Sequence, residues 1–260
     1  VDDGDQDTTV TIAVDDDNSD NTFDGVADQT VTATTTDDDS PGLSVSQSDA
    51  STLVDETGST DSFTVALTTQ PLSDVVVAVS SADTGEATVS ASTLTFTSGN
   101  WNATQTVTVT GVDDTIDDGD QDTTVTIAVD DDNSDNAFDG LADQTVTATT
   151  TDNDTAAFIL STTTASVTEA GSTDTFTVVL DTQPLSDVVF TVVSADTGEA
   201  TVSPATLTFA TGNWNATQTV TVTGVDDTID DGDQSTKITI AVDDDNSDNA
   251  FDGLADQTVT

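Results

Sequence analysis

The sequence of 260 residues contains no cysteine, histidine, arginine, methionine or tyrosine, and its one basic side chain is Lys237. Without cysteine there is no disulfide or thiolate metal site, and without histidine there is no Ser-His-Asp triad or imidazole zinc site. One cation cannot neutralise phosphates, so nucleic acid and anionic membrane surfaces are excluded as partners. No apolar run reaches the length that spans a bilayer, about 18 residues, so we expect no membrane insertion.

Acidic residues are what the sequence has in excess. It contains 51 of them and a formal net charge of −50. High charge with few hydrophobic residues is typical of disordered chains. Val, Ile, Leu and Phe account for 59 of the 260 residues, just above the fraction of about 20% that signals disorder. Composition therefore leaves order or disorder open, and the residue pattern decides it.

The chain is a tandem repeat. The string GVDDTIDDGDQ begins at Gly111 and again at Gly224, a spacing of 113 residues. This period is too long for one solenoid unit and suits a complete β-sandwich of about 100 residues. We predict the C-terminal part of a truncated repeat over 1–38, a complete repeat over 39–154, and a second, nearly complete repeat over 155–260.

Alternating valine and threonine predicts β-strands throughout. Phe63, Val65 and Leu67, for example, alternate with small residues, a period of two that is typical of a half-buried strand. In the complete repeat we expect seven main strands, at 43–54, 63–69, 74–80, 87–97, 104–110, 123–129 and 144–150. We expect an insertion to interrupt the first of these strands and a kink in the fourth. No segment carries a helical stripe. The predicted fold is all-β, with tandem antiparallel seven-stranded immunoglobulin-like β-sandwiches in a linear array.

Antiparallel order sorts the loops of each sandwich onto two ends, and acidic residues gather at one of them. In the complete repeat we predict these metal ligands: Glu56, Asp83, Glu86, Asp113, Asp114, Asp117, Asp118, Asp152 and Asp154, with Asp120 and Asn153 beside them. Their counterparts in the second repeat are Glu169, Asp196, Glu199, Asp226, Asp227, Asp230 and Asp231. The corresponding exit segment of the truncated repeat adds Asp37, Asp38 and Asp39.

The loop before the last strand has a spacing of its own. Its residues Asp131, Asn133, Asp135 and Asp139 fall at positions 1, 3, 5 and 9 of an EF-hand-like loop. Because Asn136 replaces the usual glycine and position 12 is not glutamate, the match is to a generic calcium loop. In the second repeat the same loop holds Asp243, Asp245, Asn246, Asp248 and Asp252, which we expect to approach Asp152 and Asp154.

Crowded carboxylates repel one another unless their pKa values rise or cations lie among them. Calcium suits this set, because it takes six to eight oxygen ligands in flexible geometry, whereas zinc and copper prefer the missing nitrogen and sulfur ligands. The alternative is that these acids are a solubilising surface. They are concentrated in a few loops while the strands are rich in Val, Thr, Ile and Ala, which favours calcium.

Three segments of the complete repeat resemble the Calx-β repeat. They are Val54-Asp55-Glu56 with Gly58, Leu94-Thr95-Phe96, and Val107 through Asp114. The Calx-β repeat is an immunoglobulin-like calcium-binding sandwich of sodium–calcium exchangers, integrin β4 and large bacterial surface proteins. The amino-acid sequence of the repeats is most similar to that of the tandem extender modules of giant bacterial RTX adhesins.

The resemblance implies calcium binding by an early glutamate, an Asp-Asp pair, a following acid and an acidic exit segment. The matching residues here are Glu56, Asp113, Asp114, Asp117 and 152–154, and in the second repeat Glu169, Asp226, Asp227 and Asp230. The aspartate of the exchangers' Gly-Ser-Asp-Tyr segment has no match. Asp83 and Glu86 are candidates to replace it.

Two enzymatic interpretations of the acidic residues are less well supported by the sequence than calcium binding. Asp83 and Asp196 each begin an Asp-Thr-Gly triplet like that of aspartic proteases, whose two carboxylates lie about 3 Å apart. Here each triplet belongs to its own module. A carboxylate pair could also hydrolyse glycosides, but one tryptophan per repeat and no tyrosine make a poor sugar platform. We therefore predict no enzymatic activity.

The leading hypothesis is a calcium-stiffened spacer of a secreted bacterial cell-surface adhesin, extracellular and exported by type I secretion. Its partners would be neighbouring repeats of the same chain, which would form a monomeric rod. One alternative is an adhesion module that itself binds a glycan, ice or another cell. A further alternative is a calcium sensor of a transporter.

Overall fold

The computed structural model describes residues 1–230 and 232–260, so the predicted ligand Asp231 lies outside the described residues. Within these ranges, the secondary structure consists of β-strands and four three-residue 3-10 turns. The turns are η1 (Asp131–Asn133), η2 (Asn136–Phe138), η3 (Asp244–Asn246) and η4 (Asn249–Phe251). The all-β prediction is confirmed. Over the same ranges, no helix has the length and apolar character needed to cross a membrane.

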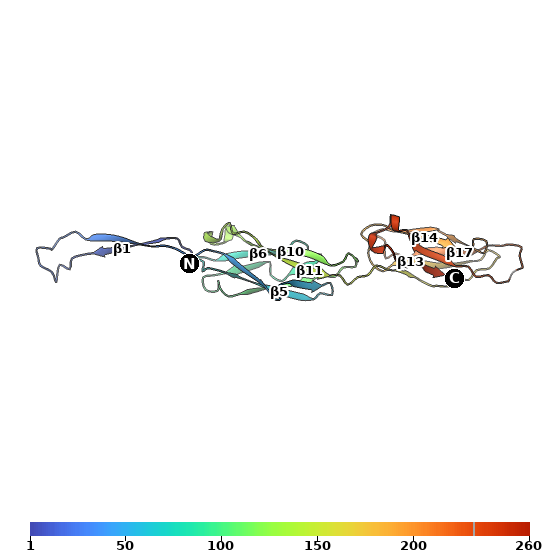
Figure 1. Ribbon diagram of the computed structural model, residues 1–260, viewed down its shortest axis with the longest axis horizontal. Helices are drawn as coiled ribbons and strands as arrows, with labels where there is room; N and C mark the ends of the chain where they lie inside the picture. Colours follow the sequence, from blue (N-terminus) through green and yellow to red (C-terminus); the bar gives the residue numbers. More distant parts are fainter. Residues whose placement is uncertain (231) are drawn as a thin grey trace. The chain divides into compact units, whose positions relative to one another are not determined.

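The first sandwich contains two sheets (Figure 1). One has the order β3-β5-β9-β7, with β3 (Leu43–Gln47), β5 (Thr60–Leu67), β9 (Gln105–Gly111) and β7 (Ala87–Val89). The other has the order β4-β11-β10-β6-β8, with β4 (Thr52–Asp55), β11 (Gln144–Thr151), β10 (Gln121–Val129), β6 (Val75–Ser81) and β8 (Thr93–Phe96).

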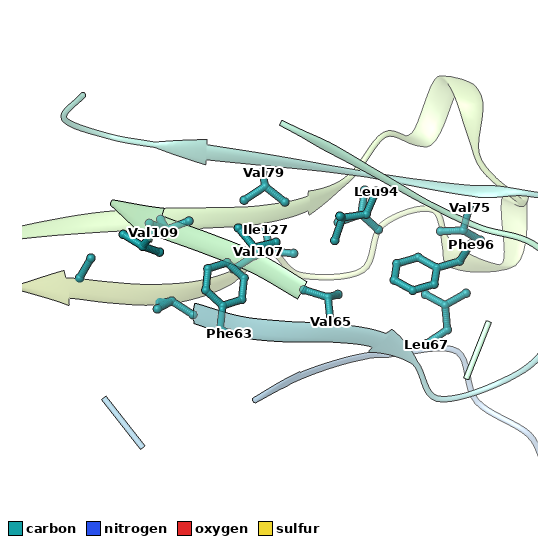
Figure 2. Close-up of a cluster of buried hydrophobic side chains, with 14 of the residues drawn as sticks. Phe63, Val65, Leu67, Val75, Val79, Leu94, Phe96, Val107, Val109 and Ile127 are labelled. Atoms are coloured by element: carbon teal, nitrogen blue, oxygen red, sulfur yellow. The ribbon is translucent and has the colours of Figure 1, made fainter. Parts of the chain in front are cut away.

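The core of the first sandwich is filled by every second residue of its strands. Phe63 and Val107 from one sheet and Phe96 and Ile127 from the other are fully buried in one hydrophobic cluster. Figure 2 shows these side chains pointing into the space between the strands. The intervening threonines face outward, because successive side chains of a strand point to opposite faces. This alternation explains how a chain so rich in aspartate and threonine folds.

The second sandwich repeats the arrangement with eight strands. One sheet has the order β12-β13-β17-β15, with β12 (Phe158–Leu160), β13 (Thr173–Leu180), β17 (Gln218–Gly224) and β15 (Ala200–Ser203). The other has the order β16-β14-β18-β19, with β16 (Thr206–Phe209), β14 (Val188–Ser194), β18 (Ile238–Val242) and β19 (Gln257–Val259). Phe190 makes edge-to-face contacts with Phe158 and Phe209 in its core, at centroid distances of 4.8 and 5.9 Å.

Two predicted strands, one expected to be interrupted by an insertion and the other expected to be kinked, are each divided between the two sheets. The predicted strand 43–54 forms β3 in one sheet and β4 in the other, and the predicted strand 87–97 forms β7 and β8 in the same way. A polar loop at 48–51 separates the first pair, and Ser90-Ala91-Ser92 separates the second. Strands that change sheets close the edges of a sandwich.

Residues 1–38 form a hairpin of β1 (Gln6–Ile12) and β2 (Gln29–Thr35), paired from Gln6 with Thr35 to Ile12 with Gln29. All residues of both strands are exposed. In the first sandwich, the positions matching Ile12 and Phe23 are Ile127 and Phe138, which are almost completely buried. The hairpin thus has the pattern of β10 and β11 without a covering sheet. The division into repeats after residues 38 and 154 stays a prediction.

Candidate metal centre

The loop that follows β9 and the segment that follows β11 carry a group of acids that were predicted as metal ligands. The loop Asp113–Gln121 forms one compact unit with residues Thr151–Thr260. We call the carboxylates of Asp113, Asp114, Asp117, Asp118, Asp152 and Asp154 the acidic cluster. All six were predicted as ligands, and all six belong to this unit.

A glycine fixes where the loop begins. A Cβ atom on Gly111 would lie 2.1 Å from the carbonyl oxygen of Asp55, so only glycine allows the end of β9 to approach the end of β4 this closely. The next amide, that of Val112, donates a hydrogen bond to the carbonyl oxygen of Glu86 at 2.9 Å. The hydroxyl of Thr150, at the end of β11, donates to the same oxygen at 3.2 Å. These contacts tie together the segments that precede the cluster.

Backbone amides orient several carboxylates of the acidic cluster. Asp152 accepts from the amide of Gly119 through Oδ2 and from the amide of Asp154 through Oδ1, both at 2.7 Å. Asp114 Oδ1 accepts from the amide of Ile116 at 2.7 Å. Because each such bond fixes one oxygen, the carboxylates are preorganised and do not depend on flexible side-chain rotamers.

Two oxygens of the cluster are buried and accept no hydrogen bond, Asp118 Oδ1 and Asp154 Oδ2. Burial is the main reason that the pKa of Asp154 is raised, and repulsion from Asp152 and Asp114 adds to it. Burial likewise raises the pKa of Asp118, against the opposing hydrogen bond from Gln121, and repulsion from Asp114 and Asp152 contributes. Both shifts indicate negative charge that the protein does not neutralise. The sequence contains one basic side chain, Lys237, which cannot neutralise a cluster of six carboxylates.

Glu56, a predicted ligand, directly follows β4, which is the neighbour of β11 in the five-stranded sheet, and its side chain is only 2% exposed. In the acidic cluster itself, one oxygen each of Asp152 and Asp154 lie within 4.8 Å of each other. Two unit charges at this distance repel by about 3 kcal/mol at an effective dielectric constant of about 20, before further screening by water. The arrangement is an acidic cluster that can bind a metal ion.

The chemistry of the donors selects among metals. All candidate ligands are carboxylate, amide or carbonyl oxygens, which are the ligands of hard cations such as Ca²⁺ and Mg²⁺. A shell drawn from carboxylate oxygens of several segments is irregular, and an irregular shell suits calcium better than magnesium, which requires a near-ideal octahedron. The unpartnered oxygens of Asp118 and Asp154 are the atoms that such a cation would contact first.

In each predicted EF-hand-like loop, one aspartate accepts hydrogen bonds from backbone amides of its own loop and of the loop before β6 or β14. Asp135 is 7% exposed and accepts from the amides of Leu72 and Ser73 through Oδ2 and from the amide of Ala137 through Oδ1. Asp248 does the same in the second repeat, with the amides of Ser186 and Ala250. The remaining predicted ligands of these loops lie within the 3-10 turns or at their caps: Asp131, Asn133, Asp139, Asp243, Asp245 and Asp252. Metal binding by these loops stays a prediction.

The predicted ligands in the loops after β6 and β14 take part in hydrogen bonds to backbone amides. Asp83 and Asp196 are exposed, and each accepts from the amide two residues later, at 2.8 and 2.9 Å. The carbonyl oxygens of Glu86 and Glu199 accept from the amides of Val112 and Val225. A ligand role for these four carboxylates is untested.

The hairpin of residues 1–38 repeats part of the geometry around Asp152. Asp37 Oδ2 accepts from the amides of Asp3 and Gly4 at 2.9 and 2.7 Å, and Oδ1 accepts from the amide of Asp39 at 3.0 Å. The amides of Asp39 and Gly4 are the main reason that the pKa of Asp37 is lowered. The N-terminal ammonium group contacts Asp39 Oδ2 at 2.6 Å. Asp38 is exposed.

The matching end of the second sandwich is more open. Glu169, Asp226, Asp227 and Asp230 are exposed, whereas Glu56 is buried. A cavity of about 840 Å³ is lined by Glu169, Glu199 and Asp230 together with Asp233, which the sequence analysis did not select. Asp227 Oδ1 accepts from the amide of Ile229 at 2.8 Å, as Asp114 does from Ile116. The local loop conformation is thus repeated although its surroundings differ.

Three positioning residues were not predicted from the sequence: Gly111, Gly224 and Thr150. An ideal Cβ atom on either glycine would lie 2.1 Å from a backbone carbonyl oxygen. The recurrence of glycine at the end of a threonine-rich strand was a visible signal. Thr150 is 1% exposed and bonds Glu86, but nothing distinguishes it in sequence from the neighbouring threonines.

No protein-family model and no curated protein matches the chain. Among solved structures, the chain is similar to CBD12 from CALX1.2, at 13% identity over 76% of this chain and 79% of that chain, with a TM-score of 0.29. It is also similar to domains 4 and 5 of the S-layer protein SbsC, at 17% identity over 84% and 95%, with a TM-score of 0.32. A protein of unknown function from Porphyromonas gingivalis W83 matches at 11% identity over 84% and 96%, with a TM-score of 0.29. Similarity at this level carries no argument about function.

Proposed function

We propose that the chain is a calcium-binding structural segment of a secreted bacterial surface adhesin, in which calcium stiffens tandem sandwiches into a spacer. The observation that supports this most is the pair of buried, unpartnered oxygens of Asp118 and Asp154 in a cluster of six carboxylates. A cation there offsets both the burial of negative charge, which is the main reason that the two pKa values are raised, and the repulsion between carboxylates that adds to it.

The proposed stiffening follows from where the ligands lie in the chain. Asp113 to Asp118 belong to a loop, and Asp152 and Asp154 follow the last strand of the first sandwich. A cation bound by both segments crosslinks a loop to the segment that leads to the second sandwich. Without it, like charges favour separation of these segments. Extracellular calcium modules commonly bind with dissociation constants of about 10⁻⁴ to 10⁻³ M, so we expect the site to be occupied where extracellular calcium exceeds this range.

Enzymatic activity is not part of the proposal. The proposed partners are neighbouring repeats of the same chain, in a monomeric rod at the bacterial surface. The acidic composition supports this, because a net charge of −50 opposes self-association through like surfaces.

Calorimetric titration of the chain with CaCl₂ tests the proposed site. We expect Asp152→Asn to weaken calcium binding by at least about tenfold, since it removes a carboxylate charge from the cluster and alters contacts to two amides. Asp132→Asn is the matched control, because Asp132 is exposed and lies outside the acidic cluster. Equal calcium affinity in both variants, or no calcium binding by the unaltered chain, would contradict the proposal.

A further inference from the structure

Two loops of identical sequence have different surroundings. Residues 111–121 and 224–234 both read GVDDTIDDGDQ. In the first copy Ile116 is half-buried, whereas in the second copy Ile229 is 64% exposed. Because the side chains are the same, the difference must come from what packs against each loop.

The first copy is held by two amides of the second sandwich. The amide of Gln183, just after β13, donates to the carbonyl oxygen of Thr115 at 2.7 Å. The amide of Ala156, just before β12, donates to Asp117 Oδ2 at 2.7 Å. Ala156 is 4% exposed, so the second of these bonds is shielded from water. Loop and amides belong to one compact unit.

The second copy is preformed for the same contact. The amide of Ile229 donates to Asp227 Oδ1, reproducing the bond between Ile116 and Asp114 in the first copy. Asp230 and Thr228 are exposed, as is Ile229 between them. An exposed isoleucine flanked by a backbone acceptor and a carboxylate fits a partner that offers amide donors beside an apolar surface.

We infer that Thr228, Ile229 and Asp230 form a docking surface for the beginning of another repeat with the sequence of residues 155–260. In this docked state, the amides matching Gln183 and Ala156 donate to the Thr228 carbonyl oxygen and to the Asp230 carboxylate. The inference rests on the proposed function in taking a neighbouring repeat as the partner, and it is independent of calcium because the docking uses protein groups alone. This choice of partner is supported by the first copy of the loop, which accepts hydrogen bonds from the amides of Gln183 and Ala156 in the second repeat.

An extended chain tests the inference. Thr260 matches Thr147 at the spacing of 113 residues, so a copy of residues 148–260 joined after Thr260 continues the repeat in register. Amide hydrogen exchange is then followed by NMR for Gln183 and for its copy, in EDTA and in calcium, below the unfolding temperature. We expect both amides to exchange at similar rates in both conditions, each at least about tenfold slower than an unstructured amide.

Matched variants locate the contact. Ile116→Ser is expected to accelerate exchange of the Gln183 amide and to leave its copy unchanged, whereas Ile229→Ser is expected to affect only the copy. In the 260-residue chain, Ile229→Ser should leave the exchange of Gln183 unchanged. Exchange of core amides, such as the copy of Ile240, reports whether the added repeat is folded.

The outcomes separate docking from calcium binding. A folded added repeat whose Gln183 copy exchanges freely overturns the inference, as does an added repeat that fails to fold beside this loop. Protection that occurs in calcium and disappears in EDTA overturns metal-independent docking and leaves the proposed calcium site intact. Protection in EDTA together with no calcium binding supports docking and contradicts the proposed function.

Discussion

At the scale of single residues, the aspartates of this chain divide by what their oxygens contact. Asp135 has its oxygens occupied by three backbone amides, while Asp118 and Asp154 each keep a buried oxygen without a donor. The two kinds of aspartate therefore respond in opposite directions to acid and to neutral substitution.

Asp135 stabilises the fold in its ionised form. Burial alone would raise the pKa of Asp135, but the amides of Ser73, Ala137 and Leu72 outweigh burial and lower it. Its contribution is therefore complete above the unfolded-state pKa of about 3.9 and is lost as pH falls through the lower folded-state pKa. We expect Asp135→Ala to cost about 3 kcal/mol at pH 7, measured by urea unfolding, because three amides lose their acceptor. A cost equal to that of Asp132→Ala would contradict this role.

Asp118 behaves in the opposite way in the absence of calcium. Because its pKa is raised, its ionisation opposes folding, so its contribution is complete below about pH 3.9 and is lost as pH rises through the folded-state pKa. We expect Asp118→Asn to raise the melting temperature in EDTA at pH 7 and to weaken calcium binding by at least about tenfold. A lower melting temperature in EDTA would show that the charge of Asp118 is stabilised within the chain itself.

At the scale of elements, much of the fold follows from the sequence. Alternating apolar residues such as Phe63, Val65 and Leu67 located the strands, since a period of two is what a half-buried strand requires. The division of 43–54 and 87–97 between two sheets was not predictable from this pattern. Both parts of each segment alternate in the same way, and only long-range pairing decides which sheet each part joins.

The acidic cluster was predictable because antiparallel order brings alternate loops to one end of a sandwich. The role of Asp135 was not, since a carboxylate that accepts from backbone amides and one that binds a metal look alike in an aspartate-rich loop. The close approach at Gly111 depends on the separation of β4 and β9, which sequence spacing does not give.

Replacing Gly111 tests how β9 positions the cluster. We expect Gly111→Ala to cost about 3 kcal/mol or more in urea unfolding, because the new Cβ would meet the Asp55 carbonyl oxygen at 2.1 Å and the backbone would have to move. Calcium affinity should fall as well, since Glu56 follows Asp55. Gly99→Ala is the control, because its Cβ would make an ordinary contact of 3.7 Å with Thr97 Oγ1. Equal stability of the two variants would contradict the positioning role of Gly111.

At the scale of the whole molecule, the charge of −50 makes stability depend on cations. Binding to the folded state alone at a tenfold excess over Kd adds about 1.4 kcal/mol per site. For a module of about 100 residues this corresponds to an increase of roughly 5–10 °C in melting temperature per site. We expect this increase on replacing EDTA with calcium at constant ionic strength, measured by calorimetry. Equal melting temperatures in calcium and in magnesium would indicate screening without a selective site.

Stiffening is a separate consequence that solution scattering measures. If calcium crosslinks the loop Asp113–Gln121 to the segment after β11, the scattering in calcium should indicate a less flexible chain than in EDTA, with a larger radius of gyration. Both measurements are made below the unfolding temperature. Identical scattering in the two conditions, with calcium bound, would separate binding from stiffening and remove the spacer part of the proposal.

A crystal structure of the chain grown in calcium is the most direct test of the proposed site. We expect an ion contacting Asp118 Oδ1 and Asp154 Oδ2 at about 2.3–2.6 Å, with six to eight oxygen ligands. A crystal structure in which those two oxygens are hydrogen-bonded to water and no ion lies among the six carboxylates would contradict the proposed calcium site.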